Sequence, residues 1–213
     1  GISPTSPQSP HPPAGLLEGL GAEWRLDAMA IKPYPCAGAG TLPIYCAERV
    51  VALNAFESSA IARIELVTRP WGYMTGVADL GPFTNAEQAM VSAAFGVAAT
   101  LVYGNYDVDI LMKALGDPRV DALAQRIEMT AAEPGCDSEL TVTLADGRTF
   151  AASSGDIPST LLRPTDWDNL VSRFPRLASS VSRETRNRIV DEIAALDQRK
   201  TCHGIVEMLR AAD

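Results

Sequence analysis

The sequence predicts an α+β protein in which an antiparallel sheet packs against helices, followed by a C-terminal segment of helices. Residues 60–68 (AIARIELVT) alternate apolar and charged side chains, which is typical of a strand with one buried face. Residues 139–144 and 148–152 flank the turn sequence ADG, which indicates a hairpin. Residues 85–103 are rich in alanine, which indicates a helix that approaches its neighbours closely. Together these patterns favour a layer of strands covered by helices.

The composition argues against several classes of protein. The 213 residues are 46% hydrophobic, which is enough to bury a substantial core. The formal net charge of −8, with no basic run, argues against a nucleic-acid partner. No apolar run approaches the ~20 residues of a membrane span, and the N-terminus carries no pattern of an export signal. We therefore expect a cytoplasmic protein without a membrane partner.

The cysteines and histidines give no metal-binding pattern. Cys36, Cys46, Cys136 and Cys202 are not spaced as CxxC pairs, and two histidines are too few for a histidine-rich site. We expect reduced, structural thiols, no metal and no cofactor. His203 has no neighbouring motif, so a surface histidine is a simpler interpretation than a catalytic base.

The chain is predicted to have three parts. The N-terminal stretch GISPTSPQSPHPPA is rich in proline and serine, and such a composition does not bury enough apolar surface to order itself. We divide the chain into a tail or linker at residues 1–23, an α+β domain at 24–154 and C-terminal helices at 155–213.

The segment KPYPC, which begins at Lys32, has the most informative chemistry in the chain. A predicted strand over residues 24–31 leads to it, and its two prolines restrict the backbone and hold Lys32 on a stiff segment. Gly38 and Gly40 then allow a tight bend before Thr41, which is predicted to cap a helix. The amide groups of that helix start, together with Lys32, would suit an anion. The alternative is a glycine turn with a solvated lysine.

The remaining elements follow from periodicity and capping signals. Thr84 to Glu87 fit a capping box at the start of the helix over residues 85–103. The other predicted helices cover residues 107–115, 118–125, 167–174, 182–196 and 201–209. The predicted strands cover residues 60–68, 126–131, 139–144 and 148–152.

Four stretches, taken in order along the chain, resemble one known family. They are KPYPC at 32–36, NAEQAMVSAAFGVAATLVYG at 85–104, DPRVDA at 117–122 and LTVTLADGRTFA at 140–151. They resemble segments of the MmgE/PrpD family, which includes methylcitrate dehydratase, iminodisuccinate epimerase and cis-aconitate decarboxylase. The resemblance runs from about Trp24 to about Arg210 and corresponds to the second half of a family member. It implies that the family's large N-terminal helical region is not in this chain.

The resemblance implies a reaction on a small di- or tricarboxylic acid. Family members remove a proton next to a carboxylate and then lose water, epimerise or lose CO₂, which requires a cation and a base. Lys32 matches the family's lysine. The chain departs from the family pattern at Ala37, Leu42 and Phe95, where members carry groups that transfer protons. These three side chains cannot move a proton.

We therefore predict two sets of site residues. The predicted catalytic residues are Lys32 and Cys36, although a buried inert thiol is the alternative for Cys36. The predicted substrate-binding residues are Tyr34, Gly38, Gly40, Thr41, Gln88 and Ser92.

The predicted function is that of a lyase, isomerase or cyclase acting on an organic acid or an acid-derived biosynthetic intermediate. The alternative is a non-catalytic or half-site subunit that needs a separately encoded helical partner. A homodimer is compatible with both hypotheses.

Overall fold

The computed structural model describes residues 19, 21–22, 31–68, 76–133, 136–158, 161, 167–178 and 180–210. The chain divides into two compact units, residues 1–30 and residues 31–213, and all helices and strands discussed below belong to the second unit. The predicted strand over residues 24–31 lies outside the described residues except for Ile31. The three-part division of the chain stays a prediction.

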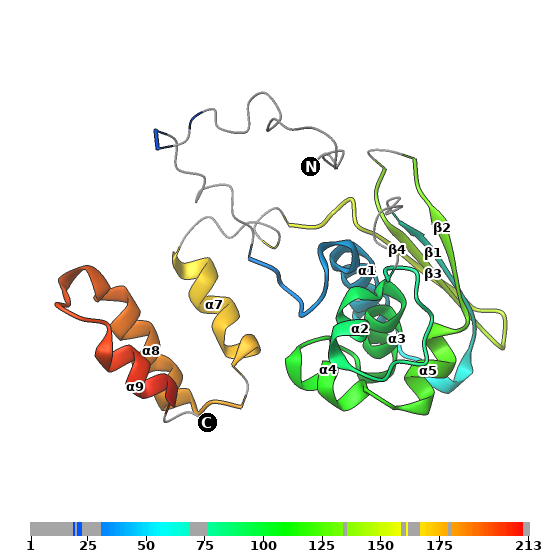
Figure 1. The fold of residues 1–213 in the computed structure, drawn as a ribbon. Coiled ribbons are helices and arrows are strands. Elements are labelled where there is room, and N and C mark those ends of the chain that lie inside the picture. The colour runs from blue at the N-terminus through cyan, green and yellow to red at the C-terminus, as the bar shows by residue number, and fades with distance from the viewer. Residues whose placement is uncertain are drawn as a thin grey trace, which may run out of the picture. The chain divides into compact units, whose positions relative to one another are not determined.

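A four-stranded sheet forms one layer of the fold (Figure 1). Its strands are β1 (Ile61–Thr68), β2 (Ile127–Ala131), β3 (Glu139–Leu144) and β4 (Thr149–Ser153), in the order β2-β1-β3-β4. The four strands predicted for the sheet are confirmed, with ends shifted by one residue at most, and so is the α+β class.

The prediction of a wholly antiparallel sheet is wrong for one pair of strands. β1 pairs with β3, and β3 with β4, in antiparallel fashion, but β1 and β2 run parallel. Residues 69–126 separate β1 from β2 and include several helices, so the chain returns to the starting end of the sheet before β2 begins. Such a crossover produces a parallel pair, whereas a short hairpin produces an antiparallel one.

The sheet has one apolar face and one polar face. Ile64 and Leu66 in β1 are fully buried, as are Leu140 and Val142 in β3. The side chain of Arg63, which precedes Ile64, lies on the other face and donates hydrogen bonds to Glu128 of β2. The alternation seen in the sequence therefore corresponds to the two faces of the sheet.

Five helices lie together on one side of the sheet in Figure 1. They are α1 (Thr41–Leu53), α2 (Ala86–Val91), α3 (Ala93–Tyr103), α4 (Val108–Ala114) and α5 (Pro118–Ala124). α1 contacts β3, β4 and α3, and α3 also contacts α5. Every residue of α3 from Ala93 to Leu101 is buried, which confirms that this alanine-rich segment is a core helix.

The predicted helix over residues 85–103 is in fact two helices that meet at Ser92. The backbone of Ser92 is extended, with φ −72° and ψ 122°. Its hydroxyl accepts a hydrogen bond from the amide of Phe95 at 3.0 Å and donates one to the carbonyl of Asp79 at 2.7 Å. Serine is favoured at such N-cap positions because its side chain replaces a missing backbone acceptor. The apolar pattern continues through the break, so periodicity alone does not reveal it.

The cap of α2 also differs from the prediction by one residue. Asn85, rather than Thr84, is the N-cap, and its side chain accepts a hydrogen bond from the amide of Gln88 at 2.9 Å. The side-chain oxygen of Gln88 in turn accepts from the amide of Thr84 at 3.1 Å. The capping box predicted for Thr84 and Glu87 is therefore absent at these residues, and Gln88 instead receives the amide of Thr84, the residue before the N-cap.

The C-terminal part contains three amphipathic helices, as predicted. They are α7 (Trp167–Leu177), α8 (Arg183–Ala194) and α9 (His203–Arg210), and α8 contacts both of the others. Ser182 caps α8. Only Ile189 among the described side chains of this part is fully buried, while Trp167, Ile193, Leu196, Val206 and Leu209 are exposed.

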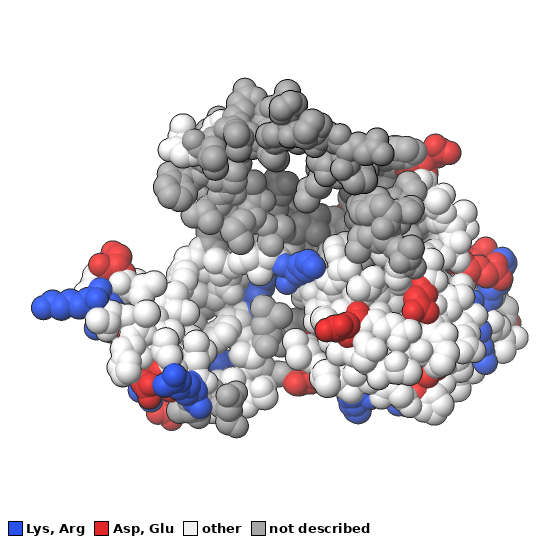
Figure 2. All heavy atoms as spheres, viewed as in Figure 1, with Lys and Arg blue, Asp and Glu red and all other residues white. Residues whose placement is uncertain are grey.

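Two features of the described residues relate to the predicted absence of a membrane or nucleic-acid partner. None of the helices that the structure describes is long and apolar enough to cross a membrane. On the face shown in Figure 2, the acidic and basic side chains of the described residues are interspersed and do not gather into a basic patch.

Candidate functional site

The segment from Lys32 to the start of α1 is a compact loop that packs on α2. Lys32 is exposed, whereas Pro33, Tyr34 and Cys36 are buried. The amide of Ala37 donates a hydrogen bond to the carbonyl of Met90 at 2.7 Å. Because Met90 lies between Gln88 and Ser92, this bond brings the loop against the segment that carries the other predicted site residues.

The start of α1 differs from the prediction in a way that affects anion binding. Gly40 is the N-cap and Thr41 is the first helical residue. Residues Gly38–Gly40 form a 3₁₀ turn (η2), in which the amide of Gly40 donates to Ala37 and that of Thr41 donates to Gly38. Pro43 has no amide hydrogen to offer. The amides of Gly40 and Thr41 are thus used inside the turn, which leaves fewer donors for an anion than the sequence suggested.

The two predicted glycines of this loop have different surroundings. A Cβ added to Gly38 would meet nothing within 4 Å. A Cβ added to Gly40 would lie 3.3 Å from Cβ and 3.4 Å from Sγ of Cys36. A side chain at position 40 would therefore crowd Cys36, while Gly38 lies at the surface.

Cys36 is a buried, protonated thiol. Its side chain is 5% exposed, and burial raises its pKa to about 11. A contact with the hydroxyl of Thr41, 3.8 Å from the sulfur, and the positive charge of Lys32 oppose this rise without cancelling it. A thiol with this pKa holds little thiolate at neutral pH, so the geometry does not favour Cys36 as a nucleophile.

Tyr34 holds the loop to α1. Its side chain is 2% exposed, and its hydroxyl donates a hydrogen bond to the Glu48 carboxylate at 2.7 Å. Glu48 was not singled out from the sequence, because no local spacing relates it to Tyr34. This contact fixes the segment that carries Lys32 onto the neighbouring helix.

Gln88 and Ser92 have structural contacts that account for their side chains. The Gln88 amide nitrogen donates to the Asp79 carboxylate at 2.9 Å. Ser92 is 1% exposed and caps α3 as described above. Both residues therefore position the turn around Asp79 beside the loop, and a substrate-binding role for them stays a prediction.

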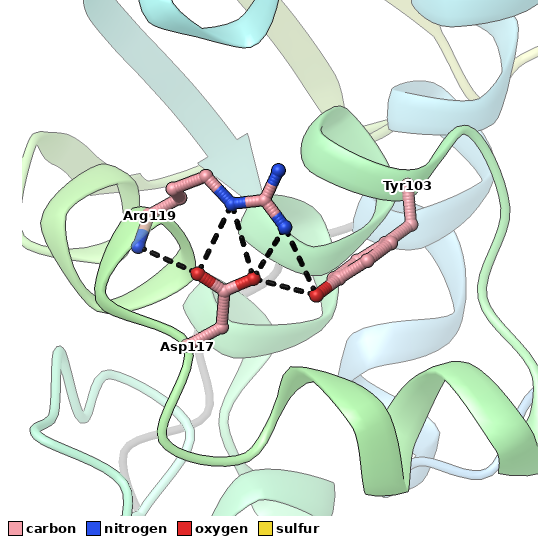
Figure 3. Close-up of polar contacts among 3 residues, drawn as sticks. All are labelled: Tyr103, Asp117 and Arg119. Atoms are coloured by element: carbon pink, nitrogen blue, oxygen red, sulfur yellow. Dashed lines mark hydrogen bonds and ion pairs between the residues drawn. The ribbon is translucent and has the colours of Figure 1, made fainter.

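A second polar cluster lies at the DPRV turn, where the sequence suggested only a turn (Figure 3). Asp117 caps α5 and receives hydrogen bonds from the Arg119 guanidinium, at 2.7 Å from Nη2, and from the Tyr103 hydroxyl. Arg119 also donates to the Tyr103 hydroxyl at 3.1 Å. The hydrogen bonds from Arg119 and then Tyr103 hold the pKa of Asp117 well below its usual range. Asp117 and Arg119 are two positions apart in the sequence, but nothing in their spacing indicates that Tyr103 is the third partner.

This cluster predicts an acid-sensitive contribution to stability. The folded-state pKa of Asp117 is lowered, so its stabilisation is present at neutral pH. It begins to fall near pH 4, the unfolded-state pKa, and is lost as the pH falls through the lower folded-state pKa. Asp117→Ala should lower the free energy of unfolding at pH 7 by about 1–2 kcal/mol, and Asp117→Asn by less, because asparagine still caps a helix. Urea unfolding at pH 7 and at pH 2 or below measures both values. Variants that lose as much stability at the acid pH as at pH 7 would show that the charge of Asp117 plays no part.

The sequence of the chain is similar to one known protein family. A sequence model of the MmgE/PrpD C-terminal domain matches residues 34–198. The matched range covers the loop from Tyr34, α1 to α5, the sheet, and α7 and α8, and it begins two residues after Lys32. No curated protein sequence matches the chain closely enough to indicate a more specific activity.

Proposed function

Because the chain belongs to the MmgE/PrpD family, we propose that it is a lyase, isomerase or cyclase acting on an organic acid or an acid-derived biosynthetic intermediate. In this proposal Lys32 binds a carboxylate of the substrate. The loop that follows Lys32 forms one wall of the binding site.

The position of Lys32 is the observation that supports this proposal. Its side chain is exposed, yet it is near enough to Cys36 for its charge to oppose the rise of the thiol's pKa. Cys36 in turn contacts Thr41, the first residue of α1. A cation at the rim of a fixed, mostly buried loop is available to a ligand, and it stabilises negative charge that develops next to a carboxylate.

The side chains that replace the family's proton-transfer groups favour a mechanism in which the site orients the substrate. Phe95 is fully buried in the core, and its ring packs edge-on to Phe83 with 4.9 Å between centroids. Ala37 and Leu42 are half-buried and carry no titratable group. We therefore propose that the site orients a reactive substrate and stabilises its charge, so that ordering accounts for most of the rate enhancement.

The proposal is tested by incubating the chain in D₂O with a panel of small di- and tricarboxylic acids. Proton NMR then follows three changes: exchange of the hydrogen next to a carboxylate, new alkene signals, and loss of CO₂. Turnover above a chain-free control supports the proposal. An unchanged panel would count against an enzyme of this class that acts alone.

The alternative function is a half-site subunit that needs a helical partner. The observation that favours it is apolar exposure in the C-terminal part, with Trp167 42%, Leu196 45% and Leu209 53% exposed. Exposed apolar residues mark an interface where they cluster, and Trp167 and Ile193 line one apolar groove between α7 and α8. Light scattering of the purified chain distinguishes an enzyme that acts alone from a half-site subunit. A stable monomer that turns over substrate would argue against an obligate partner.

A further inference from the structure

The strongest unassigned feature is a surface cavity between the 3₁₀ turn η3 (Ser58–Ala60) and α5. Its volume is about 340 Å³, which suits a small metabolite. Arg119 and Arg126 line it together with Ser58 and Ser59, and Pro118 and Leu123 add apolar surface. Among the described residues that line it, none is acidic.

Both guanidinium groups at this cavity are fixed by contacts outside it. Asp117 holds Nε and Nη2 of Arg119, and Figure 3 shows the other terminal nitrogen pointing away from the carboxylate. The ring of Tyr103 lies 5.3 Å from the Arg119 guanidinium carbon. Nη1 of Arg126 donates to the carbonyl of Ile61 at 2.8 Å. A held guanidinium loses less conformational entropy on binding a ligand than a mobile one does.

The charge and the donors at this cavity match an oxyanion. The two guanidinium groups and the carboxylate of Asp117 together carry one net positive charge. Arginine presents planar pairs of N–H donors that fit the oxygens of phosphate and carboxylate groups. The hydroxyls of Ser58 and Ser59 supply further hydrogen-bond donors at the same cavity.

We propose that this cavity binds the phosphate or carboxylate group of a small metabolite through Arg126, Arg119 and the Ser58–Ser59 turn. The site is separate from the loop of Lys32 and does not depend on the function proposed for that loop. Phosphate and carboxylate present the same chemistry to these donors, so the test has one arm for each.

The test follows ¹H–¹⁵N spectra of the full chain during titration with inorganic phosphate in one arm and succinate in the other. Sodium chloride keeps the ionic strength constant, because screening alone shifts signals. We expect saturable shifts of the Ser58 and Ser59 amides in at least one arm. Arg126→Gln should weaken that binding about tenfold or more, as expected for the loss of charge-assisted hydrogen bonds.

Two control variants test whether anion binding is specific to this cavity. Arg148→Gln removes an exposed arginine that pairs with Asp146 in the hairpin, and Lys32→Ala removes the cation of the proposed active site. Both should leave the affinity at Ser58 and Ser59 unchanged. No saturable shift at about 10 mM of either anion, or binding that Arg126→Gln leaves intact, would overturn the proposal.

Discussion

Replacing Lys32 by alanine is expected to lower kcat/KM for an organic-acid substrate by about 10- to 100-fold, the loss that follows when a charge-assisted hydrogen bond to a carboxylate is removed. Lys32→Arg keeps the charge and should retain part of the activity. The lysine side chain is exposed, so neither variant should change the free energy of unfolding by more than about 0.5 kcal/mol. Steady-state kinetics on the substrate found by the D₂O assay, with urea unfolding beside it, measures both effects.

Lys200 provides the matched control for this experiment. It is an exposed lysine outside the loop, and Lys200→Ala should leave kcat/KM unchanged. Equal activity in the wild-type and Lys32→Ala chains would show that the lysine has no part in the reaction, while the fold and the family would stand.

Replacing Gly96 by alanine should destabilise the protein by about 1–3 kcal/mol, although alanine normally favours a helix over glycine. Gly96 lies in α3 where that helix packs on α1. An added Cβ would come within 2.6 Å of Cδ1 and 2.7 Å of Cγ1 of Ile44, a fully buried side chain. Overpacking at this contact forces either helix to shift. Urea or thermal unfolding followed by circular dichroism measures the change.

A double-mutant cycle identifies the cause of this loss. Ile44→Ala alone should cost about 2–5 kcal/mol through the cavity it leaves. With Gly96→Ala in the same chain, the new methyl group has space, so the double variant should be more stable than the two separate losses predict. Gly204→Ala in α9 is the control, since a Cβ added to Gly204 would meet nothing within 4 Å. If Gly96→Ala were as stable as the wild type, the packing of α1 on α3 would not be as close as described.

The strands were predictable from sequence because each one places apolar side chains on a single face. In β1, charged Arg63 and Glu65 alternate with Ile64 and Leu66, and the two apolar side chains are the buried ones. The direction of β2 was not predictable, because β2 pairs with β1 only after a crossover through several helices, and no local pattern records where such a crossover ends. The break at Ser92 was missed for a related reason, since a core helix and a pair of core helices share one apolar pattern.

The contact between the Lys32 loop and the segment around Gln88 and Ser92 was predictable, whereas the side-chain contacts within the loop were not. The loop after Lys32 does meet the segment around Gln88 and Ser92, through the bond from Ala37 to Met90. The burial of Tyr34 and Cys36 depends on Glu48 and Thr41 in α1, so spacing within the loop could not show it. The cluster of Tyr103 with Asp117 and Arg119 likewise joins two helices that are distant in sequence.

The most direct test of the proposed active site is whether Lys32 binds a carboxylate. The chain has three lysines, Lys32, Lys113 and Lys200, so reductive methylation with ¹³C-formaldehyde gives few signals and preserves their charge. Lysine-to-arginine variants assign each signal. Titration with small di- and tricarboxylates should shift the Lys32 signal saturably and leave that of Lys200 in place. A Lys32 signal that stays fixed, or moves no further than that of Lys200, would contradict the carboxylate-binding role of Lys32.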